Sequence, residues 1–277
     1  MICFFLFQGL NTKSFRKSSS LSKRTSGKST TKASKSKHIY PTQYVNKLTF
    51  TNKAIFAGQS IAVFENDVWL CGLNGKVYRH SGFNAEITGS APTDCKNIAV
   101  NRKGTLLVAT KSKKLYVLNK IQSKTAAWFT INSPDIEDIS IGLRNEIYFI
   151  DTKGVIYGLN SYNKTNMSYE KFNKTEFGAK CRIMVDSNTN SVLLINSLGE
   201  LYRVTSDKQT RLLPTIFAED ACVDADSNIY LASRNGILKK QRDLNDFNFV
   251  ERGIAKRIAC HNSVWIIGYD DSVYSGA

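Results

Sequence analysis

The amino-acid sequence predicts an all-β protein, a six-bladed β-propeller of tandem repeats that follows a basic N-terminal extension. Three observations carry this prediction. A set of short apolar runs recurs six times, successive recurrences are 37 to 44 residues apart, and polar turns separate the runs. Repeats of about 20 to 50 residues indicate propellers or solenoids. The runs are short, β-branched and aromatic, and they lack the 3.6-residue period of helical repeats.

The N-terminal extension, residues 1–43, differs sharply from the rest of the chain in charge. The first 53 residues hold eleven Lys or Arg and no Asp or Glu, and the first acidic residue is Glu65. The other 224 residues carry 27 basic and 23 acidic side chains, so they contribute only +4 to the net charge of +15. Because residues 11–40 are mainly Ser, Thr and Lys, they cannot bury enough apolar surface to offset the entropy of ordering. We expect the extension to be disordered on its own.

A segment this basic and free of acids favours a strongly anionic partner. We prefer an acidic protein surface such as that of tubulin. Nucleic acid is an alternative, although the extension lacks the interleaved aromatic residues typical of sequence-specific RNA binding. The side chains expected to contact the partner are Lys13, Arg16, Lys17, Lys23, Arg24, Lys28, Lys32, Lys35 and Lys37.

The sequence favours a cytoplasmic or cytoskeletal location, including a cilium. The apolar run near the N-terminus is short and precedes the basic residues, the reverse of a secretory signal, and we expect no membrane span. A mitochondrial presequence is less favoured, because Lys outnumbers Arg in the extension. Six widely spaced cysteines without a CxxC motif are interpreted as reduced thiols.

Residues 44–277 form the predicted propeller, with three consecutive strands in each unit. The first runs are 61–63, 98–100, 139–141, 183–185, 221–223 and 258–260. The second runs are 68–70, 106–108, 147–149, 192–194, 229–231 and 264–266. The third runs are 75–78, 113–116, 154–157, 199–202, 236–239 and 271–274.

A fourth, more variable strand is expected at the outer edge of each blade, at 83–87, 128–131, 169–172, 210–213 and 247–250. The sixth unit lacks this strand. Residues 44–50 precede the first unit in the same way that each fourth strand precedes the next unit, so they can supply the missing strand. The two ends of the chain would then share one blade, and the third strand of that blade would not be left as an unpaired edge.

The units resemble tectonin (TECPR) β-propeller repeats, which combine an Ile-Ala-Val-like strand, a Val-Trp-like strand and a Gly-x-Ile-Tyr-Arg strand. The first unit matches best, at 57–63, 68–72 and 75–79, and the last matches at 253–260, 264–268 and 272–274. The second-strand Trp is present only at Trp69 and Trp265, and Lys239 replaces the third-strand Tyr of unit five. The resemblance implies the propeller fold and, as an alternative function, a lectin that binds glycans or lipid head groups.

Two sets of residues resemble ligand-binding groups, and we interpret both as structural. The recurring Tyr78, Tyr116, Tyr157, Tyr202 and Tyr274 are expected to pack between blades rather than stack on sugars. The Asp-rich segments 186–190 and 224–228 lack the Gly and Glu of an EF-type calcium loop and are expected to be tight turns.

No catalytic, cofactor-binding or metal-binding residue is assigned, because the chain has no HExxH, GxSxG, Walker or GxGxxG motif. The sequence therefore predicts a non-enzymatic structural or adaptor protein. Its propeller scaffold would be anchored by the basic extension to an acidic polymer, with the microtubules of a cilium or flagellum as the favoured setting. A tectonin-like lectin and an organellar RNA-associated factor are the alternatives.

Overall fold

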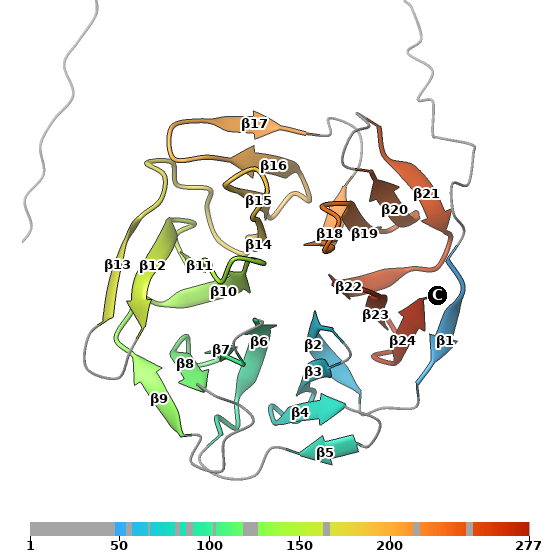
Figure 1. Ribbon diagram of the computed structural model, residues 1–277, viewed down its shortest axis with the longest axis horizontal. Helices are drawn as coiled ribbons and strands as arrows, with labels where there is room; N and C mark the ends of the chain where they lie inside the picture. The colour runs from blue at the N-terminus through green and yellow to red at the C-terminus, as the bar shows by residue number, and fades with distance from the viewer. Residues whose placement is uncertain are drawn as a thin grey trace, which may run out of the picture. The chain divides into compact units, whose positions relative to one another are not determined.

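Six four-stranded antiparallel sheets form a ring in the computed structural model of the protein (Figure 1). The described residues contain strands and no helix, and so no helix among them could cross a membrane. The structure describes residues 48–53, 57–65, 67–80, 84–86, 91–101, 104–118, 127–162, 167–212, 217–241 and 246–276.

Each sheet is one blade, numbered here in chain order, and the predicted six-bladed propeller is confirmed. Blades 1 to 3 comprise β2 (Gly58–Phe64), β3 (Asp67–Gly72), β4 (Val77–His80) and β5 (Asn84–Glu86); β6 (Cys95–Val100), β7 (Leu106–Thr110), β8 (Leu115–Leu118) and β9 (Trp128–Ile131); and β10 (Ile136–Ile141), β11 (Ile147–Asp151), β12 (Ile156–Tyr162) and β13 (Met167–Lys171). Blades 4 to 6 comprise β14 (Arg182–Asp186), β15 (Ser191–Ile195), β16 (Leu201–Val204) and β17 (Gln209–Arg211); β18 (Ala218–Val223), β19 (Ile229–Ser233), β20 (Gly236–Lys240) and β21 (Asn248–Glu251); and β22 (Ala255–Cys260), β23 (Val264–Gly268), β24 (Val273–Gly276) and β1 (Phe50–Asn52).

The first strand of every blade lies at the centre of the ring (Figure 1). These strands are β2, β6, β10, β14, β18 and β22, and each contacts the first strand of the next blade, with β22 against β2 completing the circle. The apolar runs predicted as first strands therefore converge on the axis of the propeller.

The two ends of the described chain share blade 6. Strand β1 pairs antiparallel with β24, with Phe50 opposite Gly276. The strand overlaps the predicted 44–50 only at Phe50, and residues 44–47 lie outside the described residues. The displacement is explained by Leu48, whose backbone N–H donates to Val250 O of blade 5 at 3.1 Å, so the chain crosses from blade 5 before it joins blade 6.

The turn between the second and third strands explains the recurring glycine of the repeat. Gly75, Gly154 and Gly199 all adopt positive φ there, between 79° and 86°. A Cβ on Gly75 would lie 2.2 Å from Thr93 O, so this position cannot accept a side chain without movement. Lys113 and Asp271 hold the same left-handed conformation in blades 2 and 6, with φ of 64° and 65°.

The hydrophobic core lies between blades. One cluster joins Leu107 and Val117 of blade 2 to Ile136 and Phe149 of blade 3, and all four side chains are fully buried. The second strand of each blade is buried on both faces, so the side chains on both faces are shielded from water. The second strands are therefore continuous apolar runs, without the alternation of polar and apolar residues typical of half-exposed strands.

Two disulfides correct the prediction of reduced thiols. Cys71 is bonded to Cys95, which joins blades 1 and 2, and Cys222 is bonded to Cys260, which joins blades 5 and 6. Packing of neighbouring blades brings the paired Cα atoms to 5.5 and 5.8 Å, although 24 and 38 residues separate them in the chain. Cys181 is free and buried, and burial raises the pKa of its thiol to about 11.

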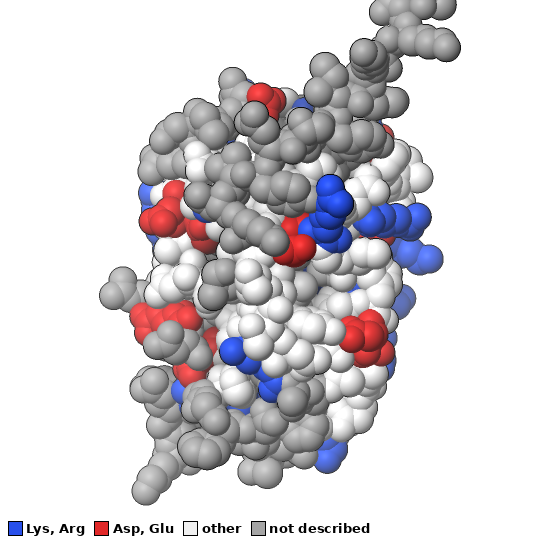
Figure 2. Space-filling model, turned by 90° about the vertical axis from the view of Figure 1, so that its right-hand side faces the viewer, with Lys and Arg blue, Asp and Glu red and all other residues white. Residues whose placement is uncertain are grey.

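The outer surface of the ring carries both signs of charge. Figure 2 shows acidic and basic side chains interspersed with uncharged ones on the side of the ring that includes β21, β24 and β1. This distribution agrees with the near balance of charge in the sequence beyond residue 53.

Candidate functional site

A narrow channel along the axis of the ring receives side chains from all six blades. Its volume is about 130 Å³, and every first strand contributes to its lining. The residue just before each predicted first-strand run is polar or charged. These six equivalent positions are Ser60, Asn97, Asp138, Arg182, Asp220 and Arg257.

Five of the six side chains, all except Arg182, tie their own blade to the next one through its backbone. Ser60 Oγ accepts a hydrogen bond from Ile98 N–H at 3.3 Å, and Asp138 Oδ2 accepts one from Ile183 N–H at 3.0 Å. The Asn97 amide donates to Glu137 O at 2.9 Å. Asp220 Oδ2 accepts from Ile258 N–H at 3.1 Å. The channel residues therefore hold adjacent blades in register.

The two arginines in the ring of six polar positions behave differently. Arg257 Nε donates to Gln59 O at 3.1 Å and so links blade 6 to blade 1. Arg182 instead reaches back across the channel, where Nη1 donates to Asn97 Oδ1 at 2.7 Å and lies 3.5 Å from Asp138 Oδ1.

Burial controls the protonation of the two channel carboxylates. It raises the pKa of Asp220 to about 7, and the nearby Arg182 charge only partly offsets this effect. Burial also raises the pKa of Asp138, again against the lowering effect of Arg182. Desolvation of a charged group outweighs one imperfect ion pair, as expected in a site closed off from water.

Asp220 predicts a specific pH dependence of stability. Between about pH 4 and pH 7 the folded state binds a proton that the unfolded state has released, so this residue lowers stability as pH rises through that window. The Asp220→Asn variant keeps an oxygen acceptor for Ile258 N–H but has no charge to desolvate. At about 1.4 kcal/mol per pKa unit, we expect it to exceed wild type by up to about 4 kcal/mol at pH 8, with a smaller difference near pH 4. Urea unfolding at both pH values measures this, and a pH-independent difference would contradict the assignment.

A larger cavity of about 470 Å³ lies at one mouth of the channel, between blades 4 and 5. Its lining shares Arg182 and Arg257 with the channel, so the two spaces meet at these arginines. Lys180 and Arg234 add two further cations, and Glu219 is the one carboxylate among the described lining residues. Glu219 is paired with Arg234 at 2.9 Å, which leaves an excess of positive charge in this cavity, named here the mouth pocket.

The same face of the ring carries most of the exposed large apolar side chains that the structure describes. Because the first two strands of a blade are antiparallel, the loop that enters the first strand and the loop that leaves the second lie at the same end. We name this end the loop face. Leu198 and Phe217 lie there beside the mouth pocket and are 68% and 61% exposed. Ile254, in the loop that enters the first strand of blade 6, and Tyr269, in the loop that leaves its second strand, are 54% and 55% exposed.

A second cavity on the loop face has a mainly apolar character. It has a volume of about 480 Å³ and lies at blade 6, where Ile254, Tyr269 and Tyr274 meet Phe50 of the closing strand. The loop face of blades 4 to 6 therefore combines exposed apolar groups with the cationic mouth pocket.

The recurring tyrosines pack between blades, as predicted, because each lies in or against a hydrophobic cluster that joins two neighbouring blades. Tyr157 stacks on Phe149 with ring centroids 5.0 Å apart. The hydroxyls of Tyr202 and Tyr274 donate to Glu200 and Asp270, which flank the turn between second and third strands. These hydroxyls are thus engaged within their own blades.

The Asp-rich segments are turns, as predicted. Asp224 Oδ1 accepts hydrogen bonds from Asp226 N–H at 3.0 Å and Asn228 N–H at 2.8 Å, and Thr189 N–H donates to Asp186 O at 3.2 Å. The carboxylate of Asp224 therefore serves the turn between β18 and β19.

The nine basic residues predicted to bind a partner, from Lys13 to Lys37, lie outside the described residues. Conversely, sequence reasoning did not identify the mouth pocket, whose four cations come from three separate segments of the chain. The signal that could have found it is the alternation of Asp and Arg at the position before the first-strand runs in units three to six.

Comparison with known proteins shows the fold. No protein-family model matches the chain, and no curated protein matches it in sequence. A structural genomics protein of unknown function from Bacteroides thetaiotaomicron superposes with a TM-score of 0.62 at 14% identity, over 84% of this chain and 72% of the other.

Two enzymes share the architecture at similarly low identity. A gluconolactonase from Xanthomonas campestris gives a TM-score of 0.60 at 10% identity, covering 84% of this chain and 87% of its own. Virginiamycin B lyase from Staphylococcus aureus gives 0.53 at 14% identity, covering 83% and 87%. These likenesses show a propeller, because proteins of one fold carry out many unrelated functions.

Proposed function

We propose that the protein is a non-enzymatic scaffold whose propeller is anchored by its basic N-terminal extension to an acidic polymer. The observation that carries this proposal is the segregation of charge. The first 53 residues contain eleven basic and no acidic side chains, whereas the remainder is nearly balanced, with both signs interspersed on the surface in Figure 2. Electrostatic anchoring would then reside in the extension, and the ring would be free to present its faces.

The loop face of blades 4 to 6 supports a role in presenting a partner surface. Exposed apolar side chains gathered on one face, with polar groups around them, are typical of interaction sites. Hydrogen bonds between blades and two disulfides make that face a rigid platform. A preorganised surface loses little conformational entropy when a partner binds.

The channel residues support the non-enzymatic part of the proposal. In the two enzymes that share the fold, identity to this chain is 10% and 14%, too low to transfer an activity. Asp138 and Asp220 each accept a backbone hydrogen bond from the adjacent blade, so both carboxylates have a structural task.

The proposal predicts binding to an acidic polymer that depends on the charge of the extension. Cosedimentation of the full chain with polymerised tubulin should fall steeply between about 50 and 200 mM salt, because charge-based contacts are screened. Replacing five serines with Asp should weaken binding severalfold, since it adds five negative charges that offset more than half of the nine positive charges between residues 11 and 40. These serines are Ser18, Ser19, Ser20, Ser22 and Ser26.

The matched control replaces the same five serines with Ala, which leaves the charge unchanged and should leave affinity near that of wild type. Equal affinity of the Asp and Ala variants at low salt would contradict the proposal. Binding to RNA with the same salt dependence, and none to tubulin, would favour the alternative of an RNA-associated factor.

The lectin alternative rests on the resemblance of the units to tectonin repeats. Because the recurring tyrosines are engaged within their blades, a sugar would have to bind elsewhere, and the loop face offers two cavities. Saturable binding on a glycan array that survives the five Ser→Asp replacements would favour the lectin over the scaffold.

The two disulfides weigh against the cytoplasmic location expected from the sequence, because disulfides are rare in reducing compartments. The redox state of these four cysteines in cells therefore discriminates between a cytosolic polymer such as tubulin and an acidic surface met in an oxidising compartment.

A further inference from the structure

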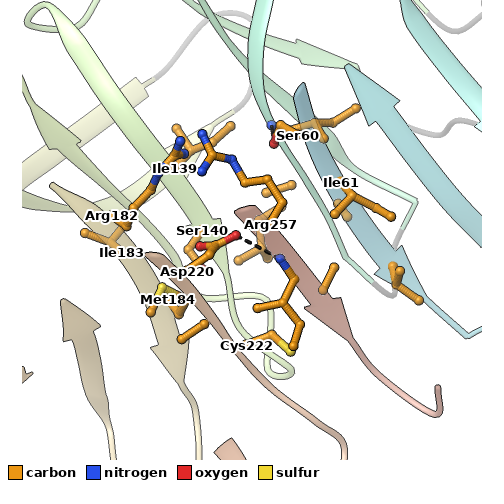
Figure 3. A pocket seen from close by; sticks show the side chains of 18 of the residues that line it. Ser60, Ile61, Ile139, Ser140, Arg182, Ile183, Met184, Asp220, Cys222 and Arg257 are labelled. Atoms are coloured by element: carbon orange, nitrogen blue, oxygen red, sulfur yellow. Dashed lines mark hydrogen bonds between the residues drawn. The ribbon is translucent and has the colours of Figure 1, made fainter. Parts of the chain in front are cut away.

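The two channel arginines are incompletely neutralised where the channel meets the mouth pocket. Figure 3 shows Arg182 and Arg257 extending from their strands toward the same part of the lining. Arg257 donates to two backbone carbonyls, Gln59 O at 3.1 Å and Lys256 O at 2.8 Å, and has no carboxylate partner among the described residues. Neutral acceptors hold a guanidinium in place but leave its charge uncompensated.

Arg182 is only partly compensated. Its side chain is 18% exposed, its short hydrogen bond goes to the neutral Asn97, and its contact with Asp138 is long at 3.5 Å. Both contacts use Nη1, so Nε and Nη2 make no hydrogen bond with the described residues. Partly buried cations with unused donors are costly unless an anion meets them.

The surroundings add to the positive charge and supply an apolar wall. Lys180 is exposed at the rim, while Arg234 is occupied by Glu219. Leu198 and Phe217 line the same pocket and are largely exposed. A volume of about 470 Å³ lies within the range of small-molecule sites, about 300 to 1,000 Å³.

We propose that the mouth pocket binds a small organic anion. Its carboxylate or phosphate group would contact the guanidinium groups of Arg182 and Arg257, and its apolar portion would lie against Leu198 and Phe217. Guanidinium groups suit both anions because their planar N–H donors match two oxygens at once. The site goes beyond the scaffold function and does not involve the N-terminal extension.

Calorimetric titration of the full chain in about 150 mM salt tests this proposal with three probes of one shape. Phenyl phosphate and benzoate carry the two candidate head groups, and benzamide carries neither charge. We expect saturable 1:1 binding of at least one anion and none of benzamide. The tighter of the two anions identifies the head group, and inorganic phosphate serves as a probe without an apolar portion.

The variants separate the site from general attraction to a basic protein. Arg257→Gln should weaken the anion at least tenfold, because it removes a charged donor. Arg144→Gln removes the same charge from an exposed turn between β10 and β11, at the opposite end of the ring from the loop face, and should leave affinity unchanged. Phe217→Ser lies at the surface, so it should preserve the fold, weaken phenyl phosphate or benzoate severalfold, and leave inorganic phosphate unaffected.

Failure of both anions to bind at millimolar concentration would overturn the proposal, as would equal losses in Arg257→Gln and Arg144→Gln. The five Ser→Asp replacements in the extension should not alter anion affinity. Loss of tubulin binding with intact anion binding, or the reverse, therefore distinguishes failure of the scaffold function from failure of this site.

Discussion

Loss of the two inter-blade disulfides is expected to destabilise the propeller by several kcal/mol. Each bond closes a loop between neighbouring blades, with a sequence separation of 24 for Cys71 and Cys95 and of 38 for Cys222 and Cys260. The chain-entropy relation assigns about 3 to 4 kcal/mol to loops of this length. The bonds lie at different blade interfaces, so replacing both pairs with Ser should cost nearly the sum of the two single effects.

Guanidinium unfolding of the two double-serine variants and of the quadruple variant measures these losses. Peptide mapping without reductant, on protein made in an oxidising compartment, should recover both cross-linked peptide pairs. Alkylation of all four cysteines before reduction would show that the bonds do not form. In that case the serine replacements should have little effect, and the cytoplasmic location would regain its support.

Removal of the closing strand is expected to destabilise the ring by about as much as removal of one disulfide. Strand β1 adds backbone pairing to β24, and Leu48 and Phe50 pack against the cluster that joins blades 5 and 6. Losing these half-buried side chains and the paired hydrogen bonds should cost about 3 to 5 kcal/mol. For a ring of this size the melting temperature should fall by roughly 6 to 20 °C.

Two truncated chains that differ by six residues provide the comparison. One begins at residue 48 and keeps β1, and the other begins at residue 54 and lacks it. The first should melt close to the full chain, because it lacks only residues 1–47 and keeps Leu48 and β1. The shorter chain should also expose the edge of β24 and aggregate more readily. Equal melting temperatures for both truncations would mean that pairing of the chain ends does not close the propeller.

The sequence predicts most of the architecture because the signals involved are local. Short apolar runs separated by polar turns identify the strands. Gly75, Gly154 and Gly199 mark turns that require a left-handed backbone. Predicted outer strands at 128–131 and 247–250 correspond to β9 and β21, the second within one residue. The closing strand was displaced, since its position depends on the contact of Leu48 with blade 5 and has no local signal.

The candidate site could not be predicted from local sequence signals. Asp138, Arg182, Asp220 and Arg257 each precede a predicted first-strand run, and nothing nearby in sequence marks them as neighbours. They converge because six first strands surround one axis. Likewise, Arg182 and Asn97 are 85 residues apart, and their hydrogen bond spans two blades.

Repetition in the sequence by itself determines the number of blades, the order of strands within each blade and the use of both chain ends in one blade. Those features follow from strand periodicity and turn chemistry, which act over a few residues. The disulfide partners, the protonation of Asp220 and the cationic mouth pocket arise only when the ring closes. Closure is what brings residues from distant units to the axis and excludes water from them, and both effects depend on distance in space rather than along the chain.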